Sequence, residues 1–130
     1  MAIPTGSGSE VLKTGTVHAL NNNVTEFKLN GDYETAYNNS SNSVVPANTI
    51  ITILNVVFCN HADDADEKVN FYVYNGSNNI WLLNEQPLSR QATFVWAEKI
   101  VLQPTWKIWA HLVTDGNVDV TYNYIVQDWT

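Results

Sequence analysis

Strict alternation of apolar and polar side chains restricts the fold of this chain more than any other feature. Residues 69–74 place Val69, Phe71 and Val73 on one side of an extended chain. A longer case is 118–127, whose apolar side would carry Val118, Val120, Tyr122, Tyr124 and Val126. Side chains of a β-strand point to opposite faces with a period of two, whereas a helix needs a period of about 3.6. No segment sustains the helical period, so the sequence predicts strands throughout.

Asn, Gly and Pro residues interrupt the chain at short intervals and divide it into short segments. The candidate strands are 11–20, 24–29, 49–60, 69–74, 80–86, 92–96, 99–102, 106–113 and 118–127. This spacing predicts an all-β fold of about eight strands, an antiparallel β-sandwich with a jelly-roll-like arrangement. We expect a single domain over 10–130. Residues 1–9 are mostly small and include Pro4, which predicts an extended N-terminal arm.

Some segments allow more detailed predictions. Residues 49–60 are largely apolar on both faces, which predicts a central strand covered on both sides. Gly15 weakens the candidate strand 11–20, and Pro87 should end the strand before it or mark a sheet edge. The polar segment 31–43 is long for a loop in a compact domain, and such loops tend to be functional or mobile.

Charge and cysteine content exclude several classes of function. The 130 residues carry a net charge of −7, and such a surface repels both nucleic-acid phosphates and anionic membranes. The single cysteine, Cys59, excludes an internal disulfide and a cysteine-rich zinc site. The start of the chain lacks the basic and apolar regions of a secretory signal. We therefore expect a protein that is made and folded in a reducing cytoplasm, without nucleic-acid or membrane partners.

An acidic segment, HADDADEK at 61–68, is the one candidate metal site. Its carboxylates are Asp63, Asp64, Asp66 and Glu67. Asp64 and Asp66 have the spacing of calcium ligands in an EF-hand loop, but the required Gly is replaced by Val69 and the final Glu by Asn75. Runs of charge are usually solvated. We interpret the segment as a solvated or contact loop, with calcium binding as the minor alternative.

The sequence offers little for catalysis. Cys59 and His61 share a strand face and could form a nucleophile and base, but the sequence proposes no third group to orient them. The three His residues lie on different predicted strands or strand ends, and no phosphate-binding or hydrolase motif occurs. We predict that the protein is not an enzyme and that it has no cofactor and no metal.

The aromatic residues suggest interfaces. Trp96 and Trp106 fit the core, whereas Trp109 faces away from the apolar side of 106–113 and Trp129 lies near the C-terminus. The interface candidates come from the arm, the polar loop and these two tryptophans: Ile3, Pro4, Tyr33, Tyr37, Trp109 and Trp129. The same aromatics could bind a glycan if two or three of them were coplanar on one surface.

Three stretches, 1–13, 45–73 and 86–129, together resemble a group of small all-β virion proteins of tailed bacteriophages, especially phages of aquatic bacteria. The shared pattern includes Pro46-Ala47-Asn48-Thr49, the Cys59-Asn60 pair before the acidic loop, and a closing stretch over 119–125. Residues 30–43 look like an insertion relative to shorter members. The resemblance implies no site residues.

The function implied by this resemblance is that of a virion structural protein, made in the bacterial cytoplasm and located in the virion. A capsid decoration (cement) protein is the first expectation. A neck or tail attachment protein and a glycan-binding module on the phage surface are the alternatives. The expected partners are the major capsid protein or other virion proteins, together with further copies of the chain, for which a trimer is our guess.

Overall fold

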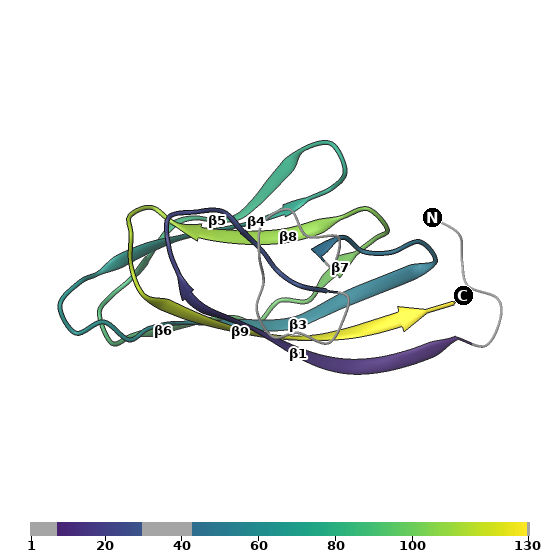
Figure 1. The fold of residues 1–130 in the computed structure, drawn as a ribbon, viewed down its shortest axis with the longest axis horizontal. Coiled ribbons are helices and arrows are strands. Elements are labelled where there is room, and N and C mark those ends of the chain that lie inside the picture. Colours follow the sequence, from purple (N-terminus) through teal and green to yellow (C-terminus); the bar gives the residue numbers. More distant parts are fainter. Residues whose placement is uncertain (1–7, 30–42, 130) are drawn as a thin grey trace.

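The computed structural model describes residues 8–29 and 43–129, and within these ranges the chain forms antiparallel strands and no α-helix (Figure 1). The strands are β1 (Ser9–Leu20), β2 (Thr25–Glu26), β3 (Thr49–Asn60), β4 (Glu67–Tyr74), β5 (Asn79–Leu88), β6 (Thr93–Trp96), β7 (Ile100–Leu102), β8 (Lys107–Leu112) and β9 (Val118–Asp128). None of the described residues belongs to a helix long and apolar enough to span a membrane.

The strands form two layers, which confirms the predicted β-sandwich (Figure 1). The five-stranded sheet has the order β1-β9-β3-β6, with β7 also pairing with β3, and the four-stranded sheet has the order β2-β8-β4-β5. Every pairing is antiparallel. Spatial neighbours are rarely consecutive in sequence, because the chain crosses between the sheets as in a jelly roll. As a result the first and last described strands lie side by side.

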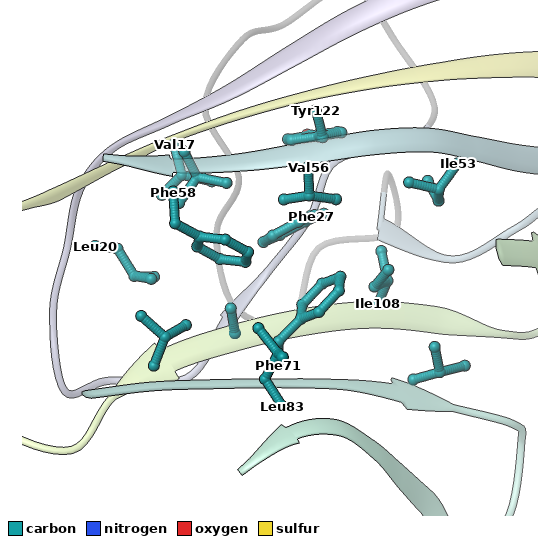
Figure 2. Packing of buried hydrophobic residues seen from close by; sticks show 14 of the residues in the cluster. Val17, Leu20, Phe27, Ile53, Val56, Phe58, Phe71, Leu83, Ile108 and Tyr122 are labelled. Carbon is teal, nitrogen blue, oxygen red and sulfur yellow. The ribbon is translucent and has the colours of Figure 1, made fainter. Parts of the chain in front are cut away.

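The core lies between the two sheets and is rich in aromatic rings (Figure 2). The rings of Phe27 and Tyr122 stack with their centroids 4.6 Å apart, and Phe71 packs edge-on against Phe58 at 5.5 Å. The Tyr122 hydroxyl donates a hydrogen bond to the main-chain carbonyl of Lys28 at 2.8 Å. Burial raises the pKa of Tyr122, because its ionised form would lose its hydration. These contacts fix the two sheets at one relative position.

Gly15 has a role that the sequence did not indicate. It lies opposite Tyr122 in the β1–β9 pairing, and a Cβ atom at this position would lie 2.1 Å from Cζ of the tyrosine ring. Only a residue without a side chain lets the Tyr122 ring lie across the strand. Gly15 was expected to weaken the strand, but β1 runs without interruption through this position because the ring fills the space above it.

Most strand positions agree with the sequence analysis, with two corrections. β3 has the predicted bounds and is flanked by strands on both sides, but its outer face is only partly buried, so the prediction that it is covered on both sides is wrong. The predicted strand 24–29 is reduced to the two residues of β2, although the main-chain nitrogen of Phe27 still donates to the carbonyl of Ile108 at 2.8 Å. Pro87 lies within β5, a strand at a sheet edge, as expected for proline.

Candidate interaction surfaces and the acidic loop

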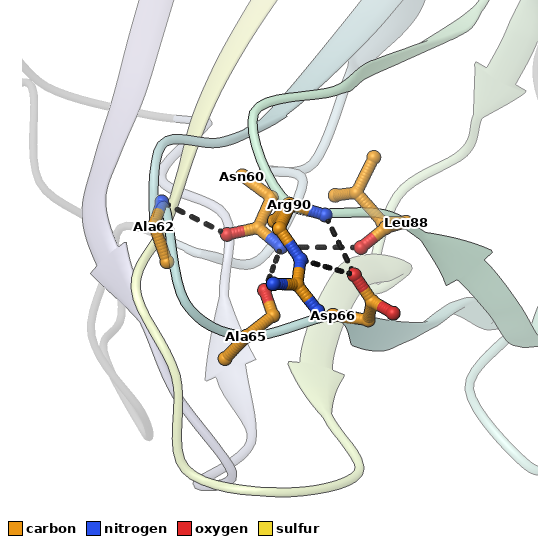
Figure 3. Close-up of polar contacts among 6 residues, drawn as sticks. All are labelled: Asn60, Ala62, Ala65, Asp66, Leu88 and Arg90. Atoms are coloured by element: carbon orange, nitrogen blue, oxygen red, sulfur yellow. Dashed lines mark hydrogen bonds and ion pairs between the residues drawn. The ribbon is translucent and has the colours of Figure 1, made fainter.

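The acidic loop between β3 and β4 is organised by a buried amide (Figure 3). The side-chain nitrogen of Asn60 donates to the carbonyl oxygens of Ala65 at 3.0 Å and Leu88 at 3.1 Å. Its side-chain oxygen accepts a hydrogen bond from the main-chain nitrogen of Ala62 at 3.1 Å. Because a buried amide must be paired, these bonds fix the path of the chain through the loop.

The four carboxylates of the loop do not converge on one point. Asp66 accepts hydrogen bonds from the main-chain nitrogen of Arg90 at 3.0 Å and from its guanidinium Nε at 3.3 Å, and these bonds lower the pKa of Asp66. Glu67 is only 4% exposed and accepts a hydrogen bond from the Thr114 hydroxyl at 3.0 Å. Asp63 and Asp64 are exposed. The solvated interpretation is therefore wrong for Glu67.

No group of three or more His, Cys, Asp or Glu residues within 8–29 and 43–129 is arranged to hold a metal ion. One carboxylate, however, does bring together two histidines that the sequence analysis had kept apart. Oδ1 of Asp119 lies 3.1 Å from Nδ1 of His18, and its Oδ2 lies 3.4 Å from Nε2 of His61. Asp119 is also the register partner of Cys59 on β3.

We call His18, His61 and Asp119 the Asp119 cluster. It corrects one argument against catalysis, namely that no third group could orient Cys59 and His61, because an acidic group does lie beside His61. Among the described residues no hydrogen bond joins Cys59 to His61. The sequence could not reveal the cluster, because His18 lies beyond an irregularity in the β1–β9 register between Val17 and Leu20. The main-chain nitrogen of Ala19, in the same irregularity, donates to Asp119 at 3.0 Å. The side chains of His18, His61 and Asp119 are between 43% and 81% exposed, so the cluster is a surface feature.

An aromatic row crosses the outer face of the four-stranded sheet. In register, Trp109 on β8 lies next to Tyr72 on β4, and Tyr72 lies next to Trp81 on β5. The rings of Tyr72 and Trp81 are 4.6 Å apart with planes tilted by 34°, and those of Tyr72 and Trp109 are 5.3 Å apart with a tilt of 55°. Tyr72 is buried between its neighbours, while Trp81 is 50% exposed. The rings pack on one another and do not form a flat platform.

Trp81 and Tyr72 were absent from the interface candidates. The alternation of 69–74 places Tyr72 on the same side as Tyr74, but it does not show which strand lies beside them. Only the β4–β8 register shows that Tyr72 lies next to the outward-facing Trp109. Trp129 lies on the other sheet, next to the end of β9, where it packs beside Gly8. Trp109 and Trp129 therefore do not share a sheet face. The candidates Ile3, Pro4, Tyr33 and Tyr37 lie outside the described residues.

The outer face of the five-stranded sheet carries apolar and neutral polar side chains across the middle of β1, β9 and β3. Three cross-strand rows define it, and we call these rows the uncharged face. The first apolar row is Leu12, Ile125, Thr52 and Val101; the amide row is Thr14, Asn123 and Asn55; the second apolar row is Thr16, Thr121, Val57 and Val95. None of these residues carries a charge. Charged or titratable groups border it on three sides. Glu10 lies beyond the first row and the Asp119 cluster beyond the last, and the exposed Glu98 and Lys99 lie between β6 and β7, beside the amide row.

Comparisons with known proteins give no family. No family model and no curated protein matches the chain. Among solved structures it is similar to a protein of the acid-stable capsid of Helicobacter pylori bacteriophage KHP30, with 11% identity over 95% of this chain and 92% of that one and a TM-score of 0.48. It is also similar to the globular domain of the zebrafish complement 1qA protein, with 12% identity over 94% of this chain and 95% of that one and a TM-score of 0.40.

Proposed function

We propose that this protein is a structural component of a tailed-bacteriophage virion, and specifically a capsid decoration protein that stabilises the head through protein–protein contacts. The observation that carries the proposal is the uncharged face. Leu12 is 68% exposed, Val95 52% and Val101 51%, all on one side of one sheet. Exposed apolar side chains on one side of a sheet favour a surface that another protein covers. We therefore propose that the protein acts by binding other proteins, with the major capsid protein or other virion proteins as partners.

The charge distribution supports a position on the outside of a particle. The net charge of −7 keeps the molecule soluble and repels packaged DNA. The stiff sandwich suits a part that must hold its shape on a shell, because the stacked rings of Phe27, Tyr122 and Tyr124 join both layers.

Three polar groups in and beside the acidic loop have structural partners. Asp66 is held by Arg90, Glu67 by Thr114, and Asn60 by the main chain of its loop. A virion part that adds contacts requires no nucleophile, base or metal. We therefore propose that the protein acts without catalysis and without a cofactor.

The test is the number and position of copies in purified particles of the phage that encodes this chain. Quantitative mass spectrometry should find hundreds of copies, and electron cryomicroscopy should place the β-sandwich on the outside of the head. About a dozen copies or fewer at one vertex would assign the protein to the neck or tail. Absence from purified virions would refute the virion role altogether.

The glycan-binding alternative has one favourable observation, the half-exposed Trp81 beside Tyr72. The tilts of 34° and 55° between neighbouring rings argue against a flat stacking surface for sugars. A glycan array with the purified protein separates the two functions. Saturable binding that is lost in Trp81→Ala or Trp109→Ala, with the fold intact, would favour the glycan module over the decoration protein.

A further inference from the structure

We propose that Asn75 is a site of spontaneous covalent modification, at which the side-chain amide is lost and an aspartate or isoaspartate residue is formed. Asn75 begins the turn that joins β4 to β5. Residues 76–79 of this turn are exposed, and Asn75 itself is half-buried. The inference is independent of the proposed function, because it concerns the chemistry of one turn.

The reaction begins from the pairing of an asparagine with a glycine. The main-chain nitrogen of the residue after an asparagine can attack the asparagine Cγ and close a five-membered ring. Glycine has no side chain to hinder this approach. The sequence has two such pairs, Asn75-Gly76 and Asn30-Gly31, and the second lies outside the described residues. Every other described asparagine is followed by a residue that has a side chain.

The turn directs two hydrogen-bond donors at the side-chain oxygen of Asn75. This Oδ1 accepts hydrogen bonds from the main-chain nitrogen of Ser77 at 3.1 Å and from that of Asn78 at 2.8 Å. When the glycine nitrogen attacks Cγ, Oδ1 becomes an oxyanion. Donors at roughly 2.7–3.1 Å stabilise such an oxyanion, and donors that are already in place need no reorganisation. The turn therefore assists ring closure in a way that an unfolded chain does not.

Further contacts hold the turn in this conformation. The main-chain nitrogen of Asn75 donates to the carbonyl of Asn78 at 3.1 Å, and the Tyr74 hydroxyl donates to the carbonyl of Gly76 at 3.0 Å. Gly76 has a φ of +92°, which residues with a side chain rarely adopt. The same glycine is therefore required by the turn and favourable for the reaction.

Water is the only other reactant. Hydroxide removes the proton from the Gly76 nitrogen, the bond from this nitrogen to Cγ forms, and the bond from Cγ to Nδ2 breaks. Nδ2 takes a proton from water and leaves as ammonia. Water then hydrolyses the cyclic imide. Its attack at Cγ gives aspartate, and its attack at the main-chain carbonyl carbon of residue 75 gives isoaspartate.

The products alter the tip of the hairpin. Either one adds a carboxylate to a chain whose net charge is −7. Isoaspartate also lengthens the main chain by one methylene group between β4 and β5. A carboxylate oxygen accepts hydrogen bonds from the same two donors, so the aspartate product can keep the turn.

Incubation of the folded full chain in mildly alkaline buffer, followed by trypsin digestion and mass spectrometry, tests the proposal. Cleavage after Lys68 and Arg90 gives the peptide 69–90, which contains Asn75 and separates it from Asn30. We expect the amide of Asn75 to be replaced by a carboxyl group, in two products that chromatography separates. The rate should exceed that of the same chain unfolded in guanidinium chloride, because only the folded turn supplies the two donors. A slower reaction in the folded chain overturns the inference.

A matched pair of variants isolates one donor. Ser77→Pro removes the main-chain N–H at residue 77, and the negative φ of Ser77 suits proline. It should lower the rate at Asn75 severalfold, which is less than the roughly 100-fold contributed by a donor in a water-excluded enzyme site. Ser77→Ala keeps the main-chain N–H and should react at the rate of the natural chain.

Circular dichroism shows whether each variant is folded. If Ser77→Pro does not fold, the comparison of the folded and unfolded natural chain decides alone. Asn75→Gln should remove the product, because its longer side chain cannot close the five-membered ring. Equal rates in folded Ser77→Pro and Ser77→Ala overturn the inference, as does reaction at Asn78 or Asn79 while Asn75 stays intact.

Discussion

Replacing Gly15 by alanine tests the packing that joins β1 to the core. The new Cβ would lie 2.1 Å from Cζ and 2.4 Å from Cε2 of Tyr122, whereas carbon atoms in contact are normally about 3.5–4.0 Å apart. The ring would have to move by more than about 1 Å. Such movement strains its stack on Phe27, at 4.6 Å, and its 2.8 Å hydrogen bond to the carbonyl of Lys28.

Two opposing effects set the magnitude. Overpacking a well-filled core costs about 1–3 kcal/mol, and weakening a hydrogen bond adds about 1 kcal/mol. Alanine reduces the conformational freedom of the unfolded chain, which raises the free energy of unfolding by about 0.4–1 kcal/mol. The net loss in the free energy of unfolding is therefore about 2 kcal/mol. For a domain of this size, this lowers Tm by roughly 7 °C.

Urea denaturation of four proteins measures the effect: the natural chain, Gly15→Ala, Tyr122→Leu and the double variant. Tyr122→Leu is strongly destabilising by itself, because it removes the ring and the hydroxyl from the core. In that background Gly15→Ala should cost little or be stabilising, since the ring that it would strike is gone. If Gly15→Ala is as stable as the natural chain, or costs the same in both backgrounds, the packing argument is refuted.

Three further predictions concern pH, the loop and metal binding. Burial raises the pKa of Tyr122 and Tyr124 above that of an unfolded tyrosine. The stability that these two residues contribute is therefore complete below about pH 10 and falls as the pH rises further. Tyr122→Phe should make this fall smaller, as measured by thermal melts between pH 8 and 11. Asn60→Ala removes the partner of the Ala65 and Leu88 carbonyls and of the Ala62 main-chain nitrogen. It should cost about 2–4 kcal/mol in urea denaturation, whereas the exposed Asn79→Ala should cost little. Chelator should leave Tm unchanged, and a rise of several degrees with calcium would restore the metal interpretation of the acidic loop.

Much of the architecture could be predicted because it follows from local patterns. The alternation in 118–127 predicted which residues of β9 face inward, and Val118, Val120 and Tyr122 are indeed buried. The apolar run 49–60 predicted the bounds of β3. Alternation works for strands because side-chain direction depends only on the extended backbone of the same few residues. The β-sandwich followed from counting such strands and the turns between them.

The candidate site could be predicted only in part, because surfaces depend on which strands become neighbours. The outward direction of Trp109 was correct, yet its contacts with Tyr72 arise from the β4–β8 register. The link between His18 and His61 required β1 and β3 to lie on either side of β9. No local rule specifies these pairings, since they join residues more than 35 positions apart.

The sequence by itself determined that this chain forms short antiparallel strands around an aromatic core, because backbone geometry converts a two-residue period into two faces. Only the tertiary structure decided what those faces meet. It placed the ring of Tyr122 over Gly15, buried Glu67 at the end of an exposed acidic loop, and left the outer side of β3 only partly buried. The physical reason is that burial depends on which part of the chain, distant in sequence, covers a residue. The order of strands in the sheets decides that.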